Sequence, residues 1–480
     1  MNKQPKILKY SSQKNYPSSV AADVGVDAVF SDSAVSILLR PCGGEEIARR
    51  QEFFWLLENG ANHCKIESIL DLLRSHRRRY ETYRAAKNNL ERYFAFIYLI
   101  KSYREVCCTL SSVRSFGAIF LEISDYYAER LTEITDLEPQ ILCAENIIDT
   151  MKSCILSFSD RILIIPDTAP TDEIGEIASV ALALGLEIPP RRKLSAKIDK
   201  SLSKAVCALY PELTEDFEGI IARFDSFNLG EAVDYISEIE FFFEILEFAE
   251  KATSCGIGHC YPIVSTTPKF RAENVYDVTL IEKSETIVPN DVDMSTEENF
   301  FFITGANGGG KTTYLRTVGV NLMLFLAGCP VFAKDGEIYP FDYFATHFCA
   351  AERFDGVGRF DDEVIRVDKM ITDAEDGRAF FLFNESFGGT DDAKGFEYAR
   401  RYAETVSVAG HFALFVTHFH QVAVTEYPML AAVIEEHDGN RRTYKMLKMC
   451  GNASSYARDI LKKYRLDRES LEKRRGNNGN

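Results

Sequence analysis

Residues 305–313 form a glycine-rich loop that ends in a lysine followed by two threonines. The loop follows an apolar run at residues 299–304 and precedes a sequence of helical character. Glycines allow backbone N–H groups to point toward phosphate oxygens, and the start of the helix adds partial positive charge. We expect Lys311 to contact the β- and γ-phosphates of a nucleotide and Thr312 to ligate Mg²⁺. The complete motif therefore predicts that the chain binds ATP with Mg²⁺. The predicted nucleotide-binding residues of the loop are Gly305, Ala306, Asn307, Gly308, Gly309, Gly310, Lys311, Thr312 and Thr313.

A second apolar run, residues 379–383, ends in Asn384 and Glu385. A strand that ends in a carboxylate is the expected Walker B element, in which Glu385 polarises the water that attacks the γ-phosphorus. Asn384 stands where aspartate is usual; its amide oxygen can ligate Mg²⁺, although without a negative charge. We therefore expect Glu385 to be catalytic and Asn384 to be a metal ligand together with Thr312. The alternative is a buried strand followed by an ordinary surface glutamate.

A third apolar run, residues 414–416, is followed by Thr417 and His418. A histidine at a strand end beside a phosphate-binding loop can hydrogen-bond the γ-phosphate or the attacking water. His418 is therefore the second predicted catalytic residue. Taken singly it is more often an ordinary polar residue at a strand end, and its position downstream of Glu385 favours the catalytic interpretation.

The sequence pattern indicates how these residues are positioned. After Gly256, short β-branched or aromatic runs alternate with helical stretches, which predicts a mostly parallel sheet with helices on both faces. Before it, apolar residues recur every three or four positions, which predicts packed helices. The expected fold is an α/β P-loop NTPase domain preceded by a mainly α-helical region. We expect a flexible tail over residues 1–25, the helical region over 26–255, the P-loop domain over 256–450, and a C-terminal helical segment and tail over 451–480.

Composition limits the remaining possibilities. The 480 residues are 46% apolar and 26% charged, which excludes a largely disordered chain. The net charge of −17 argues against a protein coated for nucleic acid, but it permits local basic faces. Tyr80 and Tyr83 lie within the first of two basic clusters, which predicts phosphate contacts with stacking or, equally, a solvated helix face. The clusters are Arg74, Arg77, Arg78, Arg79, Arg84, Lys87 and Arg92, and then Arg191, Arg192, Lys193, Lys197, Lys200 and Lys204.

Cysteine usage and hydropathy bear on the compartment. Twelve cysteines without paired spacing fit reduced thiols, and neither a signal sequence nor an apolar run long enough for a membrane span is visible. We therefore expect a cytoplasmic protein that does not enter a membrane. Cys255, His259 and Cys260 could offer three metal ligands, but no fourth is evident nearby, so zinc is disfavoured.

In order and sequence these elements resemble the MutS family of DNA mismatch repair ATPases. Residues 304–316, TGANGGGKTTYLR, are similar to the family's T-G-P-N-M-G-G-K-S-T-Y-L/M-R loop. LFVTHFHQVA, from residue 414, is similar to L-F-A-T-H-Y-x-E-L, and residues 444–456 resemble the element that leads into the family's helical dimerisation motif. Residues 288–291 read V-P-N-D, as in the family, which implies that Asn290 belongs to the nucleotide site.

The resemblance implies an ABC-like ATPase domain, a homodimer, and DNA binding through a helical lever and clamp region. It implies roles in DNA repair or recombination. Lever-like sequence begins by about residue 36, so we expect no N-terminal mismatch-reading or connector domain, and no nuclease domain is expected after the ATPase. DNA binding is then expected to follow DNA structure or the phosphate backbone, without a mismatch wedge.

Three departures from the family bear on affinity for the adenine base, in the case of Ile287, and on turnover. Ile287 replaces an aromatic residue that packs on adenine, residues 358–362 read GRFDD where G-R-S-T is expected, and Phe387-Gly388 replaces the Gly-Arg of G-R-G-T. A carboxylate near a γ-phosphate opposes closure of a shared site. We therefore expect ATP hydrolysis that is slow. One alternative is a nucleotide-dependent scaffold with weak ATPase activity that acts through protein or ribosome partners. The other is an ABC ATPase of the transporter or chromosome type, whose L-S-G-G-Q signature is missing from this sequence.

Overall fold

The computed structural model describes most of the chain in two units. It covers residues 4–10, 15–153, 155–158, 161–164, 200–225, 227–284, 286–305, 307–348, 359–374, 377–388, 391–435 and 441–449. One unit comprises Met1–Leu8 with Leu56–Glu240, and the other comprises Lys9–Trp55 with Phe241–Asn480. Two helices, α3 (Gly44–Leu57) and α11 (Tyr235–Ser254), contribute residues to both.

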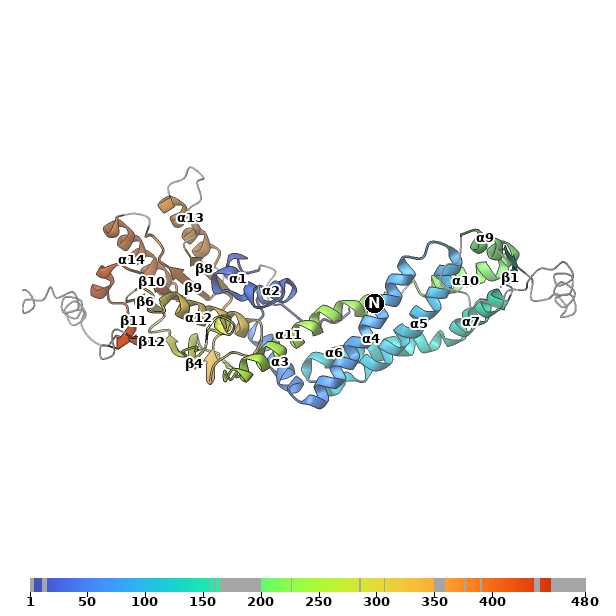
Figure 1. Cartoon of the computed structure of the whole chain (residues 1–480), viewed down its shortest axis with the longest axis horizontal. Coiled ribbons are helices and arrows are strands. Elements are labelled where there is room, and N and C mark those ends of the chain that lie inside the picture. Colours follow the sequence, from blue (N-terminus) through green and yellow to red (C-terminus); the bar gives the residue numbers. More distant parts are fainter. Residues whose placement is uncertain are drawn as a thin grey trace, which may run out of the picture. The chain divides into compact units, whose positions relative to one another are not determined.

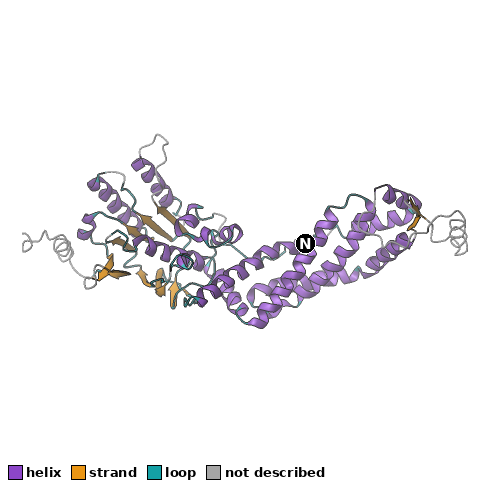
Figure 2. Ribbon diagram, viewed as in Figure 1, coloured by secondary structure: helices purple, strands orange, loops and turns teal. Residues whose placement is uncertain are grey.

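The first unit is helical, as predicted (Figure 1, Figure 2). Its long helices begin at polar caps: the side chain of Asn59 accepts from Ala61 N at 3.0 Å, and that of Asn88 accepts from Glu91 N at 3.0 Å. Aromatic residues such as Phe96 and Phe217 fill the space between the helices. Its elements are α4 (Gly60–Arg84), α5 (Asn89–Ser111), α6 (Ala118–Asp136), α7 (Glu138–Ser153), β1 (Ile155–Phe158), β2 (Arg161–Ile164), α9 (Lys200–Leu209) and α10 (Pro211–Arg223).

The second unit is built on a six-stranded sheet in the order β12-β11-β6-β10-β9-β8. Only the β11–β12 pair is antiparallel; the other pairs are parallel, as strand–helix alternation predicts. The strands are β6 (Phe300–Thr304), β8 (Tyr343–Phe348), β9 (Ala379–Asn384), β10 (Phe412–Val416), β11 (Met429–Glu435) and β12 (Arg441–Lys448). Figure 1 shows α13 (Arg359–Thr372) and α14 (Asp392–Val408) on one side of this sheet and α12 (Lys311–Leu326) on the other.

Helix α12 carries apolar residues on nearly all of its faces, and nearly all of these faces are buried. Residues 322–326 have no exposed surface. Burial within the protein therefore explains why this run is the most apolar of the sequence, and no membrane is needed to explain it. None of the helices in the described ranges has the length and apolar character that crossing a membrane requires. A smaller sheet, in the order β3 (Ile263–Val264), β7 (Asp335–Ile338), β4 (Lys269–Val275) and β5 (Asn290–Ser295), completes the unit.

The N-terminal segment differs from the prediction of a loose tail over residues 1–25. Residues 19–24 form helix α1, and Val20 and Val24 on this helix are fully buried. Val24 fills the space above α12 so closely that a Cβ atom at Gly319 would lie 2.5 Å from its Cγ1 atom. The segment packs against α12 because its few apolar residues recur at helical spacing. This pattern is too short to be recognised as a helix within a polar stretch of sequence.

The predicted boundary at residue 26 is also not the one that the contacts give. Residues 26–55 were expected in the helical region, but they pack with the sheet-containing unit. The guanidinium group of the buried Arg50 joins this segment to the rest of the sheet-containing unit, because it donates to Ala327 O at 2.9 Å and to Lys9 O at 2.6 Å. Helical periodicity predicts that a segment is helical, but it carries no information about which core the helix joins.

Candidate nucleotide-binding and catalytic site

The phosphate-binding loop lies between β6 and α12, in the strand–loop–helix context that its motif requires. Gly305, Gly308 and Gly310 have φ angles of 125°, 72° and 93°, a region that favours glycine. Two of them also lack space for a side chain. A Cβ atom at Gly305 would lie 3.2 Å from the backbone nitrogen of Ala432, and one at Gly310 would lie 3.3 Å from Tyr444 Cδ1. The antiparallel β11–β12 pair therefore supports the loop from behind.

Lys311, the first residue of α12, is buried with its ammonium group turned to the loop. Its Nζ atom donates to Gly305 O at 2.9 Å and to Asn307 Oδ1 at 3.5 Å. Burial lowers the pKa of Lys311, and the negative charge of Glu385 opposes that effect. A desolvated cation that is held by carbonyl oxygens gains from an anionic partner, so its surroundings suit a phosphate.

Thr312 and Asn384, the two predicted metal ligands, lie side by side. The Thr312 hydroxyl donates to Asn384 Oδ1 at 3.3 Å, although 72 positions separate the two residues. A hydroxyl and an amide oxygen are hard ligands of the kind that Mg²⁺ accepts alongside phosphate oxygens and water. The donor set therefore fits Mg²⁺, and bound Mg²⁺ would neutralise charge on the phosphates.

Glu385 follows β9 directly and is exposed, and its backbone lies in the left-handed region with φ of 55°. Its N–H group donates to Val416 O at 2.9 Å, which ties the end of β9 to the end of β10. Its carboxylate is close enough to Lys311 to influence the pKa of that residue. The carboxyl ends of neighbouring parallel strands thus bring the predicted base to the phosphate loop.

His418, just beyond β10, is half exposed and joins the same region. A Cβ atom at Gly388 would lie 3.3 Å from His418 Cε1 and 3.3 Å from Glu385 O, so the ring is beside the turn that follows the predicted base. Its Nε2 atom lies 3.8 Å from Asp392 Oδ1. Glycine at position 388, where the family has arginine, therefore leaves space for the His418 ring.

Asn290 is buried, and its side chain is engaged within the protein. Its Nδ2 atom donates to Tyr444 O at 3.1 Å, and its Oδ1 atom accepts from Met446 N at 2.8 Å. Asn290 therefore joins β5 to β12, and through Tyr444 it supports the back of the phosphate loop. A direct contact between Asn290 and nucleotide stays a prediction.

Tyr444 is the residue of this region that no sequence motif assigned to the nucleotide site. It has a left-handed backbone with φ of 56°, its ring faces Gly310, and 47% of the residue's surface is exposed. It reaches the loop only because β12 returns antiparallel to β11, which no local pattern shows.

Asn307, Gly308, Gly309 and Thr313 lie in the loop or at the start of α12, as expected. Predicted positions outside the described residues are Ala306, Gly358, the basic residues 191–197 and the C-terminal segment 451–480.

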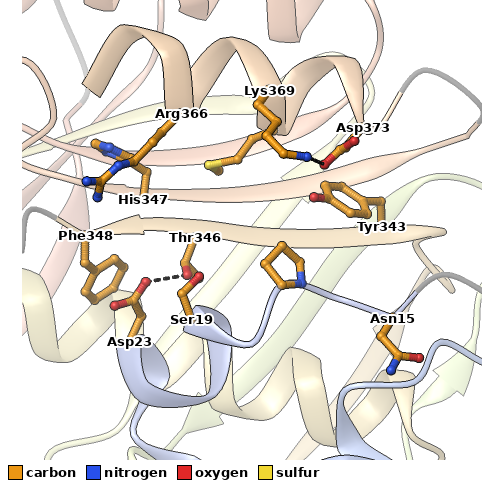
Figure 3. A pocket seen from close by; sticks show the side chains of 12 residues that line it. Asn15, Ser19, Asp23, Tyr343, Thr346, His347, Phe348, Arg366, Lys369 and Asp373 are labelled. Carbon is orange, nitrogen blue, oxygen red and sulfur yellow. Dashed lines mark hydrogen bonds and ion pairs between the residues drawn. The ribbon is translucent and has the colours of Figure 1, made fainter. Parts of the chain in front are cut away.

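A pocket of about 550 Å³ lies apart from the phosphate loop, between α1, β8 and α13 (Figure 3). Asp23 lines one wall and its carboxylate accepts from Thr346 Oγ1 at 2.6 Å, while Arg366 and Lys369 of α13 line the other. His347 at the back is buried, which lowers its pKa to about 4. Its Nδ1 atom lies 2.7 Å from Ser386 Oγ, so the pocket wall contacts the residue next to Glu385.

In the helical unit the first basic cluster is only partly available to a ligand. Arg74 pairs with Glu240 at 2.8 Å, and Arg92 pairs with Glu218 at 3.1 Å. Arg78 and Arg84 are exposed and have no ion pair with any residue that the structure describes. Available positive charge is therefore concentrated in the C-terminal half of α4.

The sheet order, the glycine-rich loop and the three strand-end residues define a P-loop NTPase-like α/β domain. Residues 301–457 match the family model of MutS domain V. Over this part of its length, the chain is similar to the MutS family.

Curated DNA mismatch repair proteins are also similar to part of the chain. The DNA mismatch repair protein MutS of Oceanobacillus iheyensis is 29% identical over 204 residues, which are 41% of this chain and 23% of the relative. MSH2 of Saccharomyces cerevisiae is 35% identical over 138 residues, 28% of this chain and 14% of the relative. MutS of Thermus thermophilus is 25% identical over 258 residues, 53% of this chain and 30% of the relative. The chain therefore spans less than a third of the length of each of these relatives.

Proposed function

We propose that this protein binds ATP through residues 305–313 and hydrolyses it slowly, as a MutS-like ATPase in which Glu385 is the general base. The observation that carries the proposal is the 3.3 Å hydrogen bond between Thr312 and Asn384, which joins the phosphate loop to the strand that ends in Glu385. In this proposal Lys311 supplies the positive charge for the β/γ-phosphates, and His418 hydrogen-bonds the γ-phosphate or the water. Slow turnover follows from Asn384, because its amide leaves Mg²⁺ with one negative charge fewer.

Two variants separate binding from chemistry. Lys311→Ala removes the buried cation of the loop and should weaken ATP binding on the order of 100-fold, measured by titration calorimetry. Glu385→Gln keeps the size of the side chain and should leave ATP affinity nearly unchanged, but it should lower the hydrolysis rate on the order of 100-fold. Lys369→Ala, an exposed lysine of α13, is the control and should change neither quantity. An unchanged rate in highly purified Glu385→Gln protein would show that Glu385 is not the base.

We also propose that the protein acts as a homodimer and binds DNA through its helical unit, by contacts to the phosphate backbone. Support comes from the available basic residues of α4 and from the DNA mismatch repair relatives. The proposed function is in DNA repair or recombination, without a mismatch wedge. Phosphate contacts release counterions, so each one makes the affinity depend more steeply on salt.

The two kinds of arginine in α4 and α5 provide an internal control for DNA binding. Replacing Arg78 and Arg84 with Gln should weaken binding to plain, branched and mismatched duplexes alike and flatten the salt dependence by about two released ions. Replacing Arg74, whose charge Glu240 already neutralises, should have a smaller effect. Fluorescence anisotropy over a range of salt concentrations measures both quantities.

Asn384 is also the observation that favours the second candidate, a nucleotide-dependent scaffold that acts through protein or ribosome partners. A scaffold needs bound nucleotide but not rapid hydrolysis. ATP binding that is lost in Lys311→Ala, together with a salt slope near zero for DNA and no dependence of the rate on Glu385, would favour the scaffold.

A further inference from the structure

The turn at residues 385–388, called here the catalytic turn, is held by buried groups that the proposed reaction does not itself use. We propose that one of them, Glu363 of α13, is a positioning residue that fixes the orientation of Glu385. The inference rests on the proposed function, because it assigns Glu363 a role only if Glu385 is the base. Glu363 would act through the backbone of the turn and would contact neither ATP nor the attacking water.

The catalytic turn has a backbone that its residue types do not favour. Glu385 and Phe387 have φ angles of 55° and 67°, and neither is a glycine. Left-handed conformations bring the Cβ atom of an L-residue too close to its own backbone, so such residues persist only where surrounding contacts hold them. A turn of this kind would relax if a contact were removed, and the direction of the Glu385 side chain would change with it.

The first three residues of the turn are each bound to a different element. Glu385 N–H donates to Val416 O of β10 at 2.9 Å. The Ser386 hydroxyl lies 2.7 Å from Nδ1 of the buried His347 on β8. Phe387 N–H donates to Glu363 Oε2 on α13 at 2.6 Å. The last of these bonds has a charged acceptor and is buried, so it is the strongest of the three.

The Phe387 side chain adds an apolar anchor beside that bond. Its ring stacks on Tyr402 of α14, with centroids 5.2 Å apart and planes inclined by 9°. It also lies 6.2 Å from the ring of Phe360, which precedes Glu363 on α13. Phe387 stands where the family has glycine, so the resemblance provides no counterpart for this anchor. Helix α13 therefore holds the turn through the ring and the backbone of one residue.

Because Glu363 and Phe387 are both buried, loss of the Glu363 side chain is expected to change the position of Glu385. Only 5% of the Glu363 surface is exposed, and Phe387 has none. Removing the carboxylate would leave the Phe387 N–H group buried without a hydrogen-bond acceptor. The group can regain an acceptor only if the turn moves. The Glu363 charge also opposes the burial-driven lowering of the pKa of His347, so Glu363 lies near a second anchor of the turn.

Substitutions of Glu363 that differ in their acceptor test this role. Glu363→Ala removes the acceptor and should lower kcat on the order of 10- to 100-fold, the cost of a small misplacement of a catalytic group. Glu363→Gln keeps an oxygen acceptor of the same length and should retain kcat within about threefold of wild type. ATP affinity should stay within about twofold in both variants, because Glu363 accepts its hydrogen bond from Phe387 of the catalytic turn. The measurements are kcat and KM from phosphate release, with the ATP dissociation constant from calorimetry.

A double-mutant cycle with Glu385→Gln distinguishes positioning from a general structural effect. If Glu363 acts through Glu385, Glu363→Ala should cause almost no further loss of kcat when Glu385 is already Gln. Lys369→Ala is the matched control, because Lys369 lies on the same helix, is exposed and pairs with Asp373 at 2.9 Å. It should leave kcat within about twofold.

The outcomes separate this inference from the proposed function. An unchanged kcat in Glu363→Ala, or an equal loss with and without the Glu385 carboxylate, overturns the positioning role while the ATPase stands. A rate that does not depend on Glu385 overturns the ATPase assignment itself. If Glu363→Ala does not fold, Glu363→Asp replaces it: its acceptor is one methylene short, and kcat should again fall while Glu363→Gln retains it.

Discussion

The phosphate loop and the catalytic turn both contain left-handed backbone, but they reach it by different means. In the loop, the described residues with positive φ are Gly305, Gly308 and Gly310, for which this conformation carries little penalty. In the turn they are Glu385 and Phe387, for which it costs about 1–2 kcal/mol each. The loop is therefore shaped by its own residue types, whereas the turn is shaped by the elements packed against it.

The difference matches the chemistry proposed for each region. A phosphate is bound by backbone N–H groups, and glycines supply them with no side chain in the way. A general base needs a side chain at a fixed position, and glycine cannot provide one. The strain of the turn is offset by buried contacts from Val416, His347 and Glu363. Substitutions that remove those contacts, or that replace the glycines of the phosphate loop, test this difference between the two regions.

The largest effect is expected from Phe387→Ala. The substitution removes a fully buried ring that stacks on Tyr402, and it leaves a non-glycine residue in the left-handed region. The free energy of unfolding of the sheet-containing unit should fall by about 3 kcal/mol or more. Gly310→Ala, the matched change in the phosphate loop, should cost only about 1–2 kcal/mol. Urea denaturation measures both, and an equal loss in the two variants would contradict the distinction between the two regions.

Stability should depend on pH through His347, which anchors the turn from β8. Burial lowers the pKa of His347 to about 4, so the folded protein keeps the imidazole neutral where the unfolded chain, with a pKa of about 6.5, takes up a proton. This stabilising contribution is therefore complete above pH 6.5 and is lost as the pH falls from 6.5 toward 4, by at most about 1.4 kcal/mol per pH unit.

His347→Gln isolates that contribution, because glutamine can hydrogen-bond Ser386 but does not titrate in this range. The urea midpoint of the variant should fall less steeply than that of wild type between pH 6.5 and 4. The pKa values of His76 and His411 are also lowered by burial and act in the same direction in both proteins, so only the difference between the two slopes is informative. Parallel slopes would show that His347 is not the group responsible.

How far the sequence predicts the site follows from the same comparison. The phosphate loop could be located in full because glycines, Lys311 and Thr312 are adjacent in the chain and need only a strand before them and a helix after them. Glu385 and His418 could be proposed because each ends an apolar run, and parallel strands bring such ends together. The α/β alternation likewise predicted the sheet.

What could not be predicted depends on contacts between distant residues. The bond from Glu363 to Phe387 joins positions 24 apart, and the ring of Tyr444 reaches Gly310 only through the return of β12. Glu363 belongs to an acidic stretch of the sequence, residues 361–376, in which nothing local marks one carboxylate as buried. The packing of α1 was missed for the same reason, because Gly319, the partner of Val24, lies about 300 residues away.

The smallest effect is expected from Asn384→Asp, which restores the usual charge at the end of β9. The new carboxylate can ligate Mg²⁺ with the same geometry as the amide oxygen that now accepts from Thr312 at 3.3 Å. Affinity for Mg·ATP should rise only slightly, since Thr312 and the phosphates supply the other ligands. The hydrolysis rate should equal that of wild type or exceed it by about threefold, because metal position aligns the γ-phosphate and each 1.36 kcal/mol of alignment is about tenfold in rate.

The gain is small because the base sits on a turn that its own anchors already hold, and those anchors do not involve Asn384. Asn384→Ala is the control: it removes the ligating oxygen as well as the polarity and should be slower than wild type by about tenfold or more. Phosphate release at saturating ATP, with Mg²⁺ varied, distinguishes metal affinity from turnover. If Asn384→Asp were more than tenfold slower than wild type, the added charge would be opposing Glu385 rather than helping Mg²⁺, and the assignment of Asn384 as a metal ligand would be wrong.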